Sequence, residues 1–220
     1  MTETRCFAAA AALGMLLIYG PLARAASAPV AAPAGAYSLD KPHGSLTFGL
    51  SHMGFSHYTA RFTRFDINLQ LDPAHPAKSS VTATVDANSL ELNAPPPGFE
   101  AEIKGPQWLD AAKYPQMRFR STRVVPTGPD TARITGDFTL HGVTKPVTLE
   151  AKFNGGYPGM SLDPHARVGF SAHGTLKRSQ FGVAAGLPPP GTNFGIGDAV
   201  EVAIEAELTG PAWKAPPAKP

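Results

Sequence analysis

The strongest constraint on the fold is an alternation of apolar and polar residues with a period of two. In residues 199–209, AVEVAIEAELT, the apolar side chains fall on one face and the glutamates on the other. Because successive side chains of a strand point to opposite faces, this pattern predicts a strand with one buried and one wet face. Eight segments share the pattern: 45–51, 64–71, 81–85, 117–120, 134–140, 147–153, 168–176 and 199–209.

These eight segments predict an all-β fold. Strands with one wet face pair antiparallel, and a set of eight leaves two edges that must be closed or covered. A closed eight-stranded barrel removes both edges, and its interior is either just filled by side chains or holds one small ligand. We therefore expect an eight-stranded antiparallel barrel, with a two-sheet sandwich as the alternative.

One stretch, residues 94–115, does not alternate. It reads APPPGFEAEIKGPQWLDAAKYP and suggests one or two short helices, at 99–104 and 106–113, with Pro106 at a first helical position. A connection this long in a compact domain usually has a function. We expect it to be a lid across one barrel end, with Phe99, Ile103 and Trp108 as its apolar contacts. A second long connection, 182–197, also contains three consecutive prolines.

The N-terminus reads as a targeting segment. Arg5 precedes an apolar run of small and hydrophobic residues, 7–19, and Ala23-Arg24-Ala25 is a small-x-small cleavage site. The run is shorter than the roughly 20 residues that span a bilayer. We predict a signal peptide at 1–25, a periplasmic mature protein and no stable transmembrane segment in it. An uncleaved anchor is the alternative.

The mature chain is predicted to have three parts. Residues 26–36 are rich in Ala, Pro and Gly and read as a flexible leader. Residues 37–210 form the barrel domain. Residues 211–220 are a Pro-rich tail, in which Trp213 is either exposed or packed against the domain.

Composition excludes several classes of function. The single cysteine, Cys6, lies in the predicted signal peptide, so the mature chain has no disulfide, thiol nucleophile or Cys-ligated zinc. Removal of residues 1–25 takes away two arginines and one glutamate, which changes the net charge from +2 to +1. With no long basic run, nucleic acid is not an expected partner.

Metal and catalytic motifs are not found either. His52 and His57 are five residues apart, which suits neither helical nor strand pairing, and no third ligand follows from spacing. The sequence has no G-x-S-x-G, no H-E-x-x-H and no phosphate-binding loop. We predict no metal site, no catalytic residues and no cofactor.

Six segments together resemble the YceI-like family of exported, lipocalin-like polyisoprenoid-binding proteins. The turn HGVTKPV at 141–147 is the clearest; Gly142 permits a tight turn, and we expect Pro146 at the first residue of the next strand. Two departures stand out, Gln180 in place of the family's Asp and Phe99–Lys104 in place of its Arg-Asp-x-His-Leu pattern. The resembling segments are 37–48, 51–66, 108–121, 136–155, 178–183 and 197–208.

The resemblance implies a long isoprenoid or similar amphiphile, of quinone or polyprenyl type, inside a lipocalin-like barrel. Each buried CH₂ group contributes about 0.8 kcal/mol, so apolar area alone can hold such a chain. We expect His52 and Arg178 at the head group or rim; Arg178 could instead pair with a carboxylate or cap a loop. The expected lining combines small residues (Ala83, Gly136, Ala151, Ala172) with six aromatic ones: Phe48, Phe65, Phe119, Phe138, Phe153 and Phe170.

Several alternatives stay open at this point. The inward side chains could fill the barrel as a packed core. The protein could be a small hydrolase or isomerase acting on an apolar substrate, or an interaction module without a ligand. A homodimer is compatible with the sequence.

Overall fold

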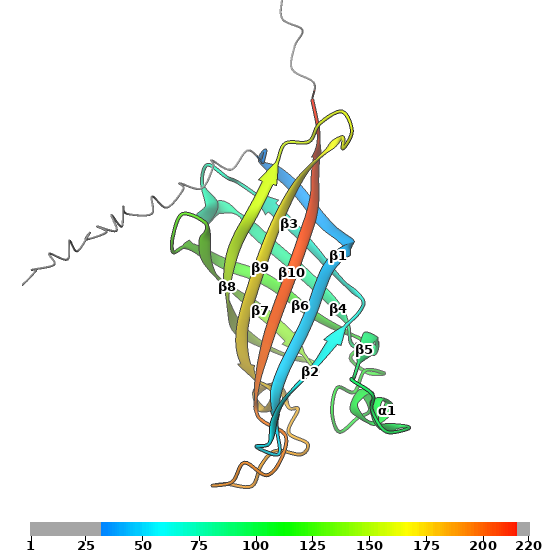
Figure 1. Cartoon of the computed structure of the whole chain (residues 1–220). Helices are drawn as coiled ribbons and strands as arrows, with labels where there is room; N and C mark the ends of the chain where they lie inside the picture. The colour runs from blue at the N-terminus through cyan, green and yellow to red at the C-terminus, as the bar shows by residue number, and fades with distance from the viewer. Residues whose placement is uncertain (1–31, 215–220) are drawn as a thin grey trace, which may run out of the picture.

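The barrel predicted from the alternation is present in the computed structural model, which describes residues 32–214 (Figure 1). The predicted signal peptide, residues 26–31 of the leader and residues 215–220 lie outside the described residues. Within residues 32–214, no helix is both long enough and apolar enough to cross a membrane.

Ten strands form one antiparallel sheet that closes on itself. The sheet order is β10-β9-β8-β7-β6-β4-β3-β1-β2-β5, and β10 also pairs with β1. The strands are β1 (Gly35–His52), β2 (Ser56–Phe62), β3 (Phe65–Leu71), β4 (Ser80–Asp86), β5 (Leu90–Glu91), β6 (Gln116–Pro126), β7 (Thr131–Leu140), β8 (Val143–Tyr157), β9 (His165–Lys177) and β10 (Ala199–Ala212).

These ten strands make an eight-stranded wall. β2 and β3 are two arms of one bent strand, separated by Thr63 and Arg64, and both pair with the long strand β1. β5 adds only a two-residue extension beside β2. The eight alternating segments lie in β1, β3, β4, β6, β7, β8, β9 and β10, so the predicted closed barrel is confirmed.

The β7–β8 hairpin shows how the sequence sets the register. His141 and Gly142 both have positive φ, +51° and +75°, as a two-residue type I′ turn requires. Leu140 pairs with Val143 directly across the turn. The expectation for Pro146 was wrong, because β8 begins at Val143. Pro146 is tolerated inside β8 since pairing with β9 starts only at Glu150, which leaves this part of β8 at a sheet edge.

One barrel end is closed by a packed core. It is built around Tyr37, whose hydroxyl donates to the carbonyl of Pro33 at 2.7 Å. Arg167 adds polar ties there, donating to Asp163 at 2.9 Å and also to Asp40. The buried core residues are Ala32, Tyr37, Ile67, Ala166, Val168, Ala206 and Leu208.

The predicted barrel domain, residues 37–210, is too short at both ends. Ala32 is buried and β1 begins at Gly35, so the last residues of the predicted leader belong to the barrel. Pro211 and Ala212 belong to β10, and the backbone N–H of Trp213 donates to the carbonyl of Pro164 at 2.8 Å. Ala-, Gly- and Pro-rich segments show no readable alternation, although their small side chains suit the crowded closed end.

The other barrel end carries the two long connections. Residues 92–115 contain α1 (Phe99–Lys104), as predicted, but 106–113 forms successive turns instead of a second helix. Asp110 has φ +45°, which a right-handed helix does not include. Three short 3₁₀ turns complete the structure: η1 (Pro76–Lys78), η2 (Ala87–Ser89) and η3 (Arg178–Phe181), the last directly before the second long connection.

Candidate functional site

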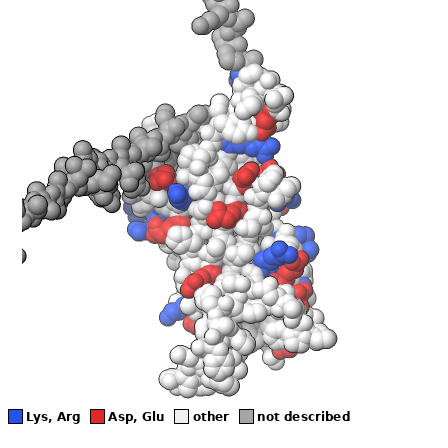
Figure 2. Space-filling view, in the orientation of Figure 1, with Lys and Arg blue, Asp and Glu red and all other residues white. Residues whose placement is uncertain are grey.

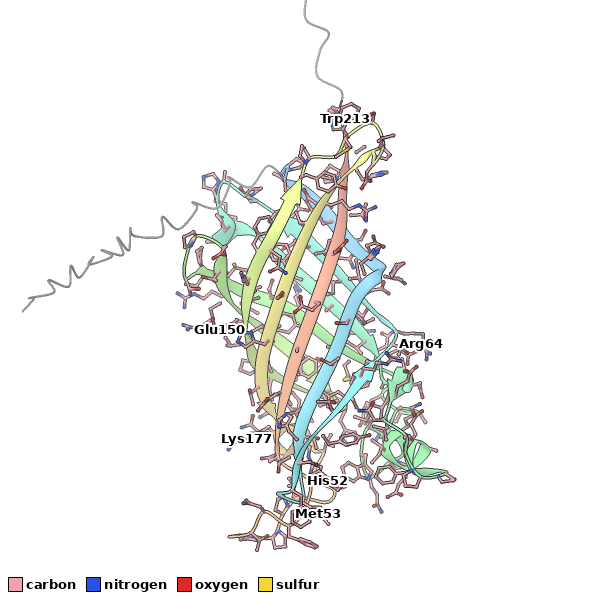
Figure 3. All side chains as sticks on the ribbon, in the orientation of Figure 1. His52, Met53, Arg64, Glu150, Lys177 and Trp213 are labelled. Carbon is pink, nitrogen blue, oxygen red and sulfur yellow. The ribbon has the colours of Figure 1, made fainter. Side chains whose placement is uncertain are left out.

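The barrel holds an apolar cavity of about 1000 Å³. It lies between the packed core of the closed end and the opposite end, which we call the mouth, where the two long connections and the β1–β2 turn meet. Four polar side chains besides the indole of Trp108 line it: His52, Tyr58, Asn93 and Arg178. His52 marks the mouth in Figure 3, at the end opposite Trp213. The interior is therefore hollow and oily, with its polar groups confined to the entrance.

Five of the six aromatic residues expected inside line this cavity: Phe48, Phe65, Phe119, Phe138 and Phe170. Phe153 does not. Its ring packs edge-on against Phe170, with the centroids 5.3 Å apart, beside the core of the closed end. A period of two predicts which face a side chain takes, but not how deep along the barrel it lies.

Of the four small residues expected inside the barrel, three line the cavity and one does not. Ala83, Ala151 and Ala172 line the cavity and leave it room. Gly136 does not, because the ring of Phe119 lies directly against its backbone, where a Cβ would be. Gly136 thus leaves room for the ring of Phe119, which lines the cavity, and does not itself enlarge the cavity.

Arg178 is the main polar element of the mouth, and it caps a loop. Its side chain is 4% exposed and donates to four carbonyls, those of Gly197, Val183, Ala185 and Ile196, at 2.8–3.0 Å. Burial lowers the pKa of the guanidinium below its usual value. Of the three roles expected for Arg178, the structure shows the cap of the second long connection.

The 92–115 connection forms one wall of the mouth. All three residues expected to act as a lid, Phe99, Ile103 and Trp108, line the cavity. The Trp108 ring lies 5.3 Å from the Arg178 guanidinium, in a cation–π arrangement. Asn93 fixes the start of the connection, because its backbone N–H donates to the Tyr58 hydroxyl and its amide to the carbonyl of Thr59, both at 2.9 Å. Whether this wall opens stays a prediction.

Comparison with known proteins settles the family. The model of the YceI-like domain matches residues 37–208 of the chain. The chain belongs to the YceI-like family. A UPF0312 protein of Pseudomonas putida is 38% identical over 179 residues, which cover 80% of this chain and 85% of that protein. A UPF0312 protein of Vibrio cholerae is 37% identical over 166 residues, 74% of this chain and 85% of that protein.

Solved structures share the YceI-like fold. BcnA of Burkholderia cenocepacia aligns with a TM-score of 0.66 at 24% identity, covering 77% of this chain and 98% of that one. A polyisoprenoid-binding domain from Saccharophagus degradans aligns with a TM-score of 0.59 at 16% identity, covering 83% of this chain and 99% of that one. At these identities the likeness supports the barrel architecture.

His52 is the last residue of β1 in this YceI-like barrel. It is exposed, and its ring centroid lies 6.4 Å from that of Tyr58. Its backbone forms a bridge with Ile196 of the second long connection. His52 thus stands at the rim, as expected, while contact with a ligand head group stays a prediction.

Sequence reasoning missed a polar cluster on the outer wall. The ligand atoms of Asp40, His43 and Glu207 lie within 4.8 Å of one another, away from the cavity. Hydrogen bonds from His43 and from Arg167 lower the pKa of the Asp40 carboxyl. These partners occupy the carboxylate, so the cluster acts as a tie between β1, β9 and β10. His43 and Glu207 come close because their neighbours Gly44 and Ala206 pair across β1 and β10. The two residues are far apart in the sequence, so no local pattern predicts the contact.

Proposed function

We propose that this YceI-like protein is a non-catalytic periplasmic carrier of a long isoprenoid lipid, of the quinone or polyprenyl type. The observation that carries the proposal is the cavity of about 1000 Å³ with apolar walls and polar groups at one end only. Such a site matches an amphiphile whose tail is long and whose polar end is small. The name of the Saccharophagus degradans domain, which describes polyisoprenoid binding by that protein, is consistent with this use of the fold.

The size of the cavity fits a long chain. An apolar cavity of about 150 Å³ holds one benzene molecule, so about 1000 Å³ has room for roughly 40 carbon atoms, or about eight isoprene units. Each buried CH₂ group adds about 0.8 kcal/mol. The tail therefore needs no polar contact inside the barrel.

The head group is proposed to lie at the mouth. The exposed ring of His52 and the polar groups of Tyr58 and Asn93 can donate to or accept from a quinone carbonyl or a prenyl hydroxyl there. Arg178 adds positive charge close by, although four carbonyls already accept from its donors. A neutral or weakly anionic head group fits this arrangement.

Native mass spectrometry of the protein purified without added lipid tests the carrier. We expect a bound mass of several hundred daltons that organic solvent extracts. An empty barrel that turns over model esters or other apolar substrates would favour the enzyme instead, and an empty, inert barrel would favour an interaction module. Fractionation of cells, with the N-terminus read from the purified protein, tests the periplasmic location through cleavage after Ala25.

A further inference from the structure

We infer that the mouth of the barrel docks on an uncharged lipid bilayer through a rigid apolar tip. The tip consists of residues 53–55 of the β1–β2 turn and residues 193–195 of the second long connection. The inference rests on the proposed function in one respect, because a bilayer is the phase from which an isoprenoid tail would enter the mouth.

Two large aromatic side chains project from the tip into solvent. Phe55 is 82% exposed and Phe194 is 63% exposed. Phe99, in the 92–115 connection that forms another wall of the mouth, is also exposed. An isolated exposed hydrophobic residue needs no explanation, but a group gathered at one opening marks an interaction surface.

Hydrogen bonds hold the two halves of the tip together. The backbone N–H of Met53 donates to the carbonyl of Gly195, and that of Gly197 donates to the carbonyl of Ser51, both at 2.7 Å. Arg178 secures the same connection from inside through its four carbonyl partners. Phe55 and Phe194 are therefore presented as one unit, and little ordering is needed on docking.

Three segments around the mouth carry no Lys, Arg, Asp or Glu, and the charged residues of the α1 wall begin only after Phe99, with Glu100. These segments are residues 50–60, 92–99 and 182–197. In Figure 2 the lowest projection of the molecule shows neither blue nor red on its face, while the wall above it carries both. A surface of this kind suits the apolar and interfacial layers of a bilayer, where aromatic rings are favoured. The tip itself has no Lys or Arg that would attract anionic lipids.

The tip is continuous with the cavity. Met53 and Phe194 line the cavity, and so does Phe99 from the other wall. A tail that leaves the bilayer beside the tip would meet apolar side chains along its whole path. This continuity favours a bilayer over a second copy of the chain or a partner protein.

Co-sedimentation with phosphatidylcholine vesicles tests the inference on the full chain. Phe55→Asp, Phe194→Asp and the double variant are compared with the wild type. The control is Leu162→Asp, which changes a 92% exposed residue in the β8–β9 connection at the closed end. Because burying a phenylalanine contributes about 1.5–3 kcal/mol and 1.4 kcal/mol is a factor of ten, the double variant should partition onto vesicles at least about tenfold less.

Three further results are expected. Leu162→Asp should bind vesicles like the wild type, and all variants share the same chain ends, so any contribution of residues 1–31 cancels. Raising the salt concentration or adding anionic lipid should change binding little. Phe55 does not line the cavity, so Phe55→Asp should keep any bound lipid that native mass spectrometry finds in the wild type.

The inference is overturned if the wild type stays in the supernatant, or if the double variant sediments as well as the wild type. It is also overturned if the tip variants abolish a dimer in gel filtration while no form binds vesicles, because the occupant would then be a second copy. A protein that binds vesicles through the tip but never carries a lipid supports the docking and refutes the carrier.

Discussion

At the scale of single residues, Arg178 shows how one side chain can organise the mouth of the barrel through bonds to the backbone. Its four acceptors are backbone carbonyls of residues 183–197, a segment that has little regular structure of its own. Ser179 extends the same tie, because its backbone N–H and hydroxyl both donate to the Asp198 carboxylate at 2.9 Å. The second long connection is therefore folded around η3.

We predict that Arg178→Met destabilises the protein by on the order of 3 kcal/mol, because buried carbonyls lose their donor. The free energy of unfolding in urea measures the change. Arg123→Met, on the exposed outer face of β6, is the matched control and should lie within about 0.5 kcal/mol of the wild type. Full stability with loss of bound lipid would show that Arg178 serves the head group instead.

At the scale of elements, α1 in the 92–115 connection has no hydrogen bond to a strand of the barrel among those that the structure describes. α1 is only six residues long, and its Glu100–Lys104 pair at 2.7 Å is internal to the helix. Figure 1 shows α1 standing beside the strands instead of covering them. Elements held in this way open at low free energy, which is what a lid over an apolar cavity requires.

Replacing residues 95–104 with a Gly-Ser segment of equal length should speed lipid exchange. The change removes Phe99 and Ile103 from the cavity wall and loosens the entrance. Transfer of a fluorescent prenyl lipid from the protein to vesicles gives the rate. The control is the same replacement at residues 73–78 of the β3–β4 connection, at the closed end. Equal exchange rates in both proteins would make the 92–115 connection a simple linker.

At the scale of the whole molecule, the closed end of the barrel is packed, whereas its middle is hollow between that end and a second buried cluster around Phe181 at the mouth. The ring of strands is continuous, so the difference comes from side-chain volume and from the connections at each end. Phe153 and Leu208 pack with the buried Tyr37 at the closed end, whereas Ala83, Ala151 and Ala172 line the cavity and leave it room. The length of tail that fits should therefore depend on these small residues.

Ala172→Phe is predicted to shorten the bound tail by about one isoprene unit. Ala172 lies beside Ala151 and Ile204 in the sheet, and an added ring would occupy roughly the space of one benzene, about 150 Å³. The lipid extracted from the purified variant, measured by mass spectrometry, gives the chain length. Ala203→Phe on the outer face of β10 is the control. An unchanged length distribution in Ala172→Phe would mean that the tail does not reach this position.

The sequence by itself determined eight of the ten strands, their antiparallel pairing and which face of each one points inward. The pleat repeats every two residues, so a local pattern is enough to assign Leu46 or Val202 to the inside and Glu201 to the outside. It also determined the β7–β8 turn at His141 and Gly142, because positive φ at two consecutive residues is a local requirement.

Only the tertiary structure decided depth, closure and volume. Phe153 and Phe119 share the same inward pattern, yet one packs in the closed end and the other lines the cavity. Ala32 and Pro211 join the barrel because neighbours distant in sequence accept them, and Arg178 finds its acceptors only after the second long connection has folded back. These outcomes depend on how all the side chains together fill the interior of the barrel. A local period of two carries no information about that total volume.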